Sequence, residues 1–232
     1  PQREYVAGSV IGIDFGLSTS ITTSEGDKLE LYVEETDRLK GLKKKRSRQV
    51  KGSNNYKKTC NLIKKEYQRL DNKKQDLAYK IVSDFSHYEH VFFQDEMISN
   101  WKKRDGYVRA GKKIQKGILG RVKALLRTKE WVTMLSRGDA TTQTCVCGAK
   151  NKHQLDERIY FCSQCGYSDD RNIHAAKNMI RFGLSDNRYN TPQGLGRTPA
   201  EDATPILHFN YLKGSTSYNP KKQETNSSSV SW

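Results

Sequence analysis

The sequence lacks any long hydrophobic run and is poor in acidic residues. No apolar stretch approaches the roughly eighteen residues of a membrane-spanning helix, so we expect no membrane partner. Only 26 Asp and Glu stand against 41 Lys and Arg in 232 residues, which leaves a net charge of +15. This surplus exceeds what solubility requires. It favours a polyanion, most simply nucleic acid, over a membrane surface as the partner.

Cysteine is scarce, but four of the five cysteines form two closely spaced pairs. Each pair is followed by a glycine, and the four residues are Cys145, Cys147, Cys162 and Cys165. This is the ligand pattern of a Cys₄ zinc ribbon, in which two short turns bring four thiolates to about 2.3 Å from one Zn²⁺. The first pair is Cys-x-Cys, so its turn is one residue shorter than usual. Two disulfides are the alternative, and no signal peptide is recognisable, which favours a reducing cytosol and zinc. We expect Cys60 to take no part.

Apolar runs bounded by turn residues predict an α/β fold. Residues 10–16, 20–24 and 29–33 are expected to form three consecutive strands. Residues 90–96 and 131–135 are expected to form two more. With 232 residues, the chain is long enough for one core and a small appended domain.

The remaining segments have helical periodicity. Residues 34–85 are highly charged, and a polar break at 51–55 predicts two antiparallel helices. Their apolar stripe consists of Ile63, Tyr67, Leu70, Leu77, Ile81 and Phe85. Residues 112–129 are predicted to form an amphipathic helix. Asp170 is predicted to cap a helix that continues through Ile180.

Acidic residues occur where the pattern predicts the ends of buried elements. Asp14 lies inside an apolar strand, Asp95 and Glu96 end another, and Asp170 begins a helix. Burying an isolated carboxylate is costly unless it is paired or binds a metal. Three carboxylates from two strands and a helix suit two Mg²⁺ ions about 4 Å apart that catalyse phosphodiester hydrolysis. Each acid alone also fits a strand end, a turn or a helix cap, so the hypothesis depends on their order and spacing.

Together these segments resemble the TnpB family of transposon-encoded, RNA-guided nucleases, which are related to the miniature type V CRISPR effectors. The resemblance rests on Gly12-Ile-Asp-Phe-Gly16, on Gln94-Asp-Glu96 and on the run from Cys165 to Asn178. It covers roughly residues 8–181, and the combined order is more specific than any single piece. The resemblance implies an RNase H-like, RuvC-type mixed sheet with an inserted helical hairpin, a Cys₄ zinc ribbon and Asp14 on the first strand.

The same resemblance implies a division of the chain and a set of partners. RuvC-like segments I and II would occupy residues 1–139, with the helical insertion at about 34–85; the zinc ribbon 140–168; the segment III helix 169–181; and a flexible tail 182–232. Guide RNA and target DNA would be the partners, with Mg²⁺ or Mn²⁺ as catalytic ions and Zn²⁺ as a structural ion. The chain starts at Pro1, so we expect the N-terminal part of a longer protein to be missing. The expected location is the bacterial cytoplasm, at the nucleoid.

Two positions depart from the pattern of the family. The second segment usually ends in Glu-Asp, whereas here the order is Asp95-Glu96, and we predict Glu96 as the catalytic acid with Asp95 as the alternate. In the third segment Asn172 stands where the family has its acidic metal ligand. We predict that Asp170 substitutes for it, with Asn172 as the alternate, because an Asn oxygen can bind Mg²⁺ but brings no charge. His174 stands where the family usually has Asn.

Three functions are compatible with these residues. The favoured one is a metal-dependent DNA endonuclease that uses Asp14, Glu96 and Asp170. A nuclease-dead, RNA-guided DNA-binding protein of the same family is the second, and Asn172 is its direct support. A zinc-ribbon nucleic-acid-binding module without chemistry is the third, and it leaves Asp14 unexplained.

Basic residues cluster in two segments that flank the acidic strand end. The first lies within residues 43–65. The second is predicted to bind nucleic acid and comprises Lys102, Lys103, Arg104, Arg109, Lys112 and Lys113. Trp101 and Tyr107 interleave with the second cluster and either stack on bases or pack on the core. Two such clusters favour a channel that follows phosphates over a merely solvated helix face.

Overall fold

A five-stranded mixed sheet forms the centre of the fold in the computed structural model, which describes residues 3–17, 19–98, 115–152, 157–187 and 189. The strands are β1 (Val6–Phe15), β2 (Ile21–Thr23), β3 (Lys28–Leu29), β4 (Tyr88–Gln94) and β5 (Val132–Leu135), in the order β3-β2-β1-β4-β5. β1 pairs antiparallel with β2 and parallel with β4, and β4 pairs parallel with β5. The predicted α/β class is therefore confirmed.

The predicted helical hairpin between the third and fourth strands is confirmed. α1 spans Asp37–Ser47 and α2 spans Asn54–Phe85. Five of the six residues of the predicted apolar stripe are buried, whereas Tyr67 is 45% exposed. The Lys43 Nζ atom lies 5.2 Å from the centroid of the Tyr67 ring, so this ring makes a cation–π contact instead of packing in the core.

The helix predicted over residues 112–129 is interrupted in the structure: residues 115 and 116 are helical, and α4 then spans Leu119–Leu126. Between them, Gly117 forms an antiparallel bridge with Tyr32. The backbone at Gly117 therefore pairs with the chain that follows β3, and this pairing breaks the helix. Residues 112–114 lie outside the described residues.

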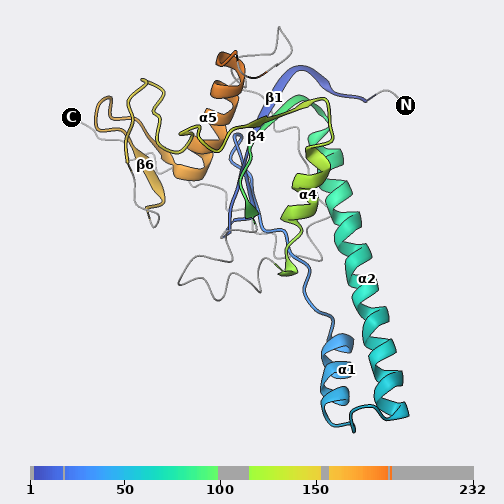
Figure 1. The fold of residues 1–232 in the computed structure, drawn as a ribbon. Coiled ribbons are helices and arrows are strands. Elements are labelled where there is room, and N and C mark those ends of the chain that lie inside the picture. Colours follow the sequence, from blue (N-terminus) through green and yellow to red (C-terminus); the bar gives the residue numbers. More distant parts are fainter. Residues whose placement is uncertain (1–2, 18, 99–114, 153–156, 188, 190–232) are drawn as a thin grey trace, which may run out of the picture.

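Helices cover both faces of the sheet. Figure 1 shows α4 and the C-terminal half of α2 on one side of the sheet, and α5 (Arg171–Ser185) on the other. α5 extends past the predicted end at Ile180. Among the described residues, no helix is long and apolar enough to cross a bilayer.

Two glycines allow α5 to approach the sheet closely. A Cβ atom on Gly12 of β1 would lie 1.9 Å from the carbonyl oxygen of Ala176. A Cβ atom on Gly183 would lie 2.2 Å from the Phe92 ring. Both distances are far below van der Waals contact, so any larger residue would force the helix and the sheet apart. The Gly12 contact is the more restrictive of the two because its neighbour is backbone.

Replacing Gly12 by Ala tests this contact. We expect Gly12→Ala to lower the free energy of unfolding by about 1–3 kcal/mol, as overpacking does in well-packed cores. The measurement is urea unfolding followed by circular dichroism. Gly41→Ala in α1 is the matched control, because its Cβ atom would meet nothing within 4 Å. This control should stabilise the chain by roughly 0.5–1 kcal/mol. Equal stability of the two variants would contradict the packing argument.

Candidate active site and zinc centre

The four predicted zinc ligands meet at one point. All four Sγ atoms lie within 4.8 Å of one another, with Cys145 3.5 Å from Cys165 and Cys147 3.7 Å from Cys162. Tetrahedral coordination with Zn–S bonds of about 2.3 Å places the sulfur atoms about 3.8 Å apart. A disulfide would require about 2.05 Å. The spacing therefore fits one Zn²⁺ ion and not two disulfides.

The two cysteine turns share one hydrogen-bond pattern although the first is one residue shorter. The Gly148 N–H donates to the Cys145 carbonyl at 3.0 Å, and the Gly166 N–H donates to the Cys162 carbonyl at 2.9 Å. Both glycines have a positive φ, 90° and 76° respectively. This left-handed conformation is accessible to glycine at little cost. The Cys-x-Cys turn is therefore one residue shorter, but the same hydrogen bond, from the glycine N–H to the first cysteine carbonyl, closes it.

The Cys162 thiol lies in surroundings that favour the thiolate. Desolvation raises its pKa, but hydrogen bonds from the backbone N–H groups of Cys165 and Gln164 and from neighbouring side chains outweigh this effect and lower the pKa to about 6. One of these donors is the Asn151 amide, 3.4 Å from Cys162 Sγ. Since the thiolate is the metal-binding form, these donors prepare a zinc ligand.

The ribbon continues directly into α5. Its strands β6 (Ile159–Phe161) and β7 (Ser168–Asp170) pair antiparallel. One residue further on, the N–H of Arg171 donates a hydrogen bond of 2.9 Å to the Arg158 carbonyl. Asp170 ends β7 and caps α5 at the same time. The position of this carboxylate is therefore set jointly by the ribbon and by the helix.

Side chains of α5 also bind backbone carbonyls of the ribbon. The Asn178 amide donates to the carbonyls of Thr141 and Thr144, both at 2.7 Å. Arg181 Nη1 donates to the carbonyl of Cys145, also at 2.7 Å. Hydrogen bonds from a buried amide and from a cation are costly to lose, because the partners would remain unsatisfied. The ribbon is thus fixed to the helix that packs on the sheet.

His174 belongs to the same contact. Its ring stacks on Tyr160 with centroids 3.7 Å apart and planes 16° apart, and its Nε2 lies 3.1 Å from the Thr144 carbonyl. Desolvation lowers the pKa of His174 to about 4, so the ring is neutral near pH 7. A neutral, stacked and buried imidazole has a packing role here and does not point to metal binding.

Two of the predicted catalytic acids, Glu96 and Asp170, act electrostatically on the third, Asp14. Asp14 lies near the carboxyl end of β1. Desolvation raises the pKa of Asp14 well above its usual value, and the negative charges of Glu96 and Asp170 raise it further, opposed by Arg171. Like charges gathered in a poorly solvated place are unfavourable without a counterion. A divalent cation between these acids would relieve their repulsion.

The structure separates the two adjacent acids at the end of β4. Asp95 lies 2.9 Å from the Nζ atom of Lys123 and 3.1 Å from Nη2 of Arg137. The hydrogen bond from Lys123 is the main cause that lowers the pKa of Asp95. Lys123 is only 7% exposed, so this pair is part of the fold. Glu96, in contrast, is the acid whose charge reaches Asp14.

The Asp170 carboxylate already has partners on both oxygens. Oδ1 accepts hydrogen bonds from the N–H groups of Asn172 and Ile173, at 3.0 and 3.2 Å, as predicted for a helix cap. Oδ2 lies 2.7 Å from Nζ of Lys28. A metal ion bound by Asp170 would therefore share this carboxylate with the Lys28 ammonium. Asn172 lies in the first turn of α5, directly after Arg171.

The acids are more widely spaced than the cysteines. Within the part of the chain that the structure describes, the four cysteines form the one group of three or more His, Cys, Asp or Glu side chains whose ligand atoms all lie within 4.8 Å of one another. Two ions about 4 Å apart do not require such a compact group, since each carboxylate can reach a different ion.

Three cations beside the acids have no signal in the sequence pattern. Lys28 and Arg137 lie in polar segments without periodicity, and Lys123 belongs to the polar side of the predicted helix. The predicted nucleic-acid-binding residues, by contrast, all lie outside the described residues, and they are Lys102, Lys103, Arg104, Arg109, Lys112 and Lys113.

Fold and site together define a protein in which a four-cysteine cluster, consistent with a zinc ribbon, is joined to a mixed α/β sheet that carries several acids. Residues 122–179 match the family model described as "Cas12f1-like, TNB domain". A "Putative RNA-guided DNA endonuclease" of Streptomyces pristinaespiralis is 27% identical over 188 residues, which cover 76% of this chain and 46% of the relative. The "Putative RNA-guided DNA endonuclease InsQ" of Escherichia coli K12 is 25% identical over 201 residues, which cover 77% of this chain and 50% of the relative.

The chain is thus similar to proteins of the TnpB/Cas12f-like family, as the sequence motifs predict. The match to the family model includes α4, β5, the cysteine turns and the first part of α5. The chain spans about half the length of the curated relatives that it matches.

We expect the purified chain to bind one Zn²⁺ ion. Cys162→Ser should abolish stoichiometric binding, because three thiolates leave the tetrahedron incomplete. The measurement is zinc released to a chromogenic chelator after thiol modification. Cys60→Ser is the matched control and should retain the metal, since Cys60 lies in α2, away from the four ligands. Zinc loss in the Cys60 variant, or full retention in the Cys162 variant, would contradict the assignment.

Proposed function

We propose that this chain is the catalytic part of an RNA-guided, metal-dependent DNA endonuclease, and that Asp14 and Glu96 hold its catalytic ions. The observation that carries the proposal is the convergence of three acids from two strand ends and a helix start: desolvation raises the pKa of Asp14, and the charges of Glu96 and Asp170 raise it further. A divalent cation offsets this repulsion, and perturbed carboxylates of this kind concentrate at functional sites. We further propose that the sheet is an RNase H-like, RuvC-type domain.

The proposed roles follow from the contacts of each side chain. Asp14 and Glu96 supply anionic oxygens from the ends of neighbouring parallel strands. Asp95 is a positioning residue, because its ion pairs with Lys123 and Arg137 fix the backbone at the end of β4. When bound, Mg²⁺ or Mn²⁺ supplies an activated water and stabilises the leaving oxygen of the phosphodiester.

Asp170 is the proposed third acid. It interacts with Asp14 electrostatically, and the Lys28 ammonium would compete with a metal ion for its carboxylate. The neutral oxygen of Asn172 adds a ligand without charge, so we propose that the ion on this side binds more weakly.

The zinc ribbon has a structural role in this proposal. Four cysteines fill the tetrahedron and leave no open position for a substrate or a catalytic water. The ribbon instead fixes the start of α5, where Asp170 lies.

The proposed partners are a guide RNA and a target DNA. The names of both relatives describe RNA-guided DNA endonucleases, and the net charge of +15 supports a polyanionic partner. Base pairing between guide and target would then supply the sequence specificity.

One observation favours a second candidate function, an RNA-guided DNA-binding protein without cleavage. Lys28 neutralises Asp170, and Asn172 stands in place of an acid. The third ligand position therefore carries little negative charge with which to hold a metal ion. A zinc-ribbon binding module without chemistry explains neither the carboxyl cluster nor the buried Lys123–Asp95 pair.

The first test concerns metal binding and stability. The raised pKa of Asp14 means that the folded chain holds this proton more tightly than the unfolded chain, so ionisation costs stability as the pH rises through the raised pKa. At pH 8 without divalent ions, Asp14→Asn should therefore melt at a higher temperature than the native chain. Mg²⁺ should raise the melting temperature of the native chain and leave that of the variant unchanged. A Mg²⁺ shift of equal size in both proteins would exclude Asp14 as a ligand.

The second test is cleavage of labelled target DNA by the full-length protein bound to its guide RNA, in Mg²⁺ and in Mn²⁺. Loss of a metal ligand that contributes several kcal/mol should reduce the rate roughly 10³-fold in Asp14→Asn. Asn172→Asp should raise the rate. Absence of cleavage by the native protein, with activity appearing in Asn172→Asp, would instead establish the binding-only function.

A further inference from the structure

The α1–α2 hairpin carries most of the excess positive charge of the chain. Residues 38–65, here called the basic arm, contain twelve Lys and Arg and no Asp or Glu. The net charge of the whole chain is +15. A surface shaped by solubility alone mixes both signs, so a segment of 28 residues without any acid needs another explanation.

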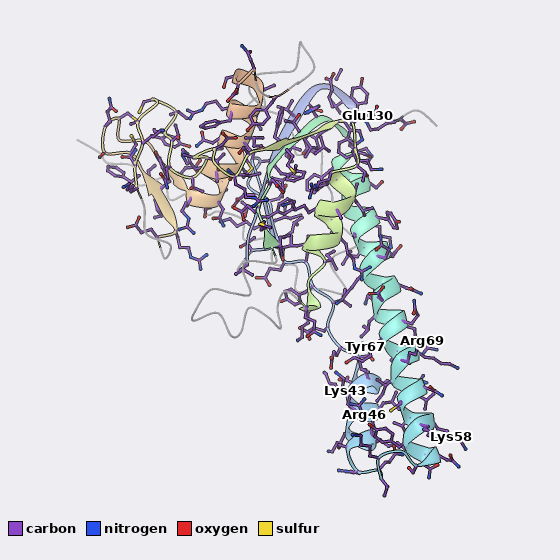
Figure 2. All side chains as sticks on the ribbon, viewed as in Figure 1. Lys43, Arg46, Lys58, Tyr67, Arg69 and Glu130 are labelled. Atoms are coloured by element: carbon purple, nitrogen blue, oxygen red, sulfur yellow. The ribbon has the colours of Figure 1, made fainter. Side chains whose placement is uncertain are left out.

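Few of these charges serve the fold. Three are paired with acids that flank the arm: Arg38 with Glu66, Lys40 with Asp37, and Lys43 with Glu35. The other nine have no ion pair with any described residue, and all of them are exposed except the half-buried Arg46: Lys44, Lys45, Arg46, Arg48, Lys51, Lys57, Lys58, Lys64 and Lys65. Figure 2 shows Arg46 on α1 and Lys58 on α2 near the end of the hairpin.

The packing of the arm leaves these cations available. Glu66 is buried and lies 3.1 Å from Arg38 and 2.5 Å from Arg69, so it ties α1 to α2. Leu39 and Ile63 are also buried in the hairpin. A small apolar and ionic contact thus holds the two helices together, and the lysines point to solvent on both.

The arm projects past the end of the sheet that carries the acids. With 32 residues, α2 is about 48 Å long. The seven residues of β4 span about 23 Å. Only Ser86 and His87 separate the two elements, so the chain reverses direction there and α2 runs back alongside β4. The difference between the two lengths means that the N-terminal end of α2 extends roughly 25 Å beyond the C-terminal end of β4. Figure 1 shows the hairpin extending beyond the end of β4, the end next to Glu96.

We propose that the basic arm binds the phosphate backbone of a nucleic-acid duplex at a distance from the scissile bond. At 3.4 Å per base pair, an overshoot of 25 Å corresponds to about seven base pairs. Both RNA and DNA offer these phosphates. The distance to the scissile bond rests on the proposed nuclease function, whereas the binding of phosphate by the arm does not.

Salt-dependent binding tests the arm. We would measure the fluorescence anisotropy of labelled DNA and RNA duplexes of about 20 base pairs for the chain and for a variant with Lys57, Lys58, Lys64 and Lys65 changed to Ala. Each phosphate contact contributes about 0.9 to the slope of log K against log salt, so the slope should fall by up to about 3.6. The duplex for which the arm variant loses more affinity is the preferred nucleic acid of the arm. A preference for either DNA or RNA supports the proposal.

Two further variants keep the result interpretable. The control changes four exposed cations outside the arm, Arg127, Lys129, Lys150 and Lys152, to Ala and removes the same charge. It should lower the slope less than the arm variant. Restoring the arm with Arg at all four positions should restore the slope. Equal slopes for the arm variant and the control, on both duplexes, would overturn the proposal.

The nuclease and the arm can fail independently. Asp14→Asn should leave the arm-dependent slope unchanged, and the arm variant should keep the Mg²⁺ shift in melting temperature. With the guided full-length protein, shortening the duplex to fewer than about seven base pairs on the arm side of the cut should abolish the effect of the arm variant on cleavage. An arm effect that is independent of duplex length would overturn the proposed distance.

Discussion

The close contact between α5 and β1 at Gly12 is the constraint on which both the position of the four-cysteine cluster and the proposed site at Asp14 depend. The missing side chain of Gly12 lets the Ala176 carbonyl lie against the strand. This approach places the start of α5, and with it Asp170, where its charge reaches Asp14. The same helix binds ribbon carbonyls through Asn178. A helix packed on the sheet therefore links the four-cysteine cluster to the acids near Asp14.

Charge balance at the strand ends explains why neighbouring acids differ in role. Lys123 and Arg137 neutralise Asp95 and lower its pKa, so this carboxylate has no need of a metal ion. Asp14 is in the opposite situation, because desolvation and other carboxylates raise its pKa. An acid whose ionised form is disfavoured by its surroundings gains most from a divalent cation. Asp170 is intermediate between the two, since Lys28 already supplies it with a cation that would compete with a metal ion.

Features encoded by local spacing were predictable from the sequence, and features that depend on distant segments were not. The cysteine pairs with their glycines, and the Asp170 cap, involve residues within a few positions of one another. The burial of Lys123 could not be predicted, because its partner Asp95 is 28 residues away and periodicity places a lysine on the solvent side. The bridge between Tyr32 and Gly117 shortened a helix for the same reason. The family resemblance supplied the order of the acids, and the ion pairs of Asp95 with Lys123 and Arg137 support the proposed choice of Glu96.

The proposed metal site can be tested directly by a crystal structure of the zinc-loaded chain soaked in Mn²⁺, with anomalous diffraction recorded at the manganese and zinc edges. We expect a manganese peak within bonding distance of the carboxylates of both Asp14 and Glu96, in addition to zinc among the four cysteines. A manganese peak at Asp95, or no manganese near Asp14 in crystals that contain zinc at the cysteines, would contradict the proposed site.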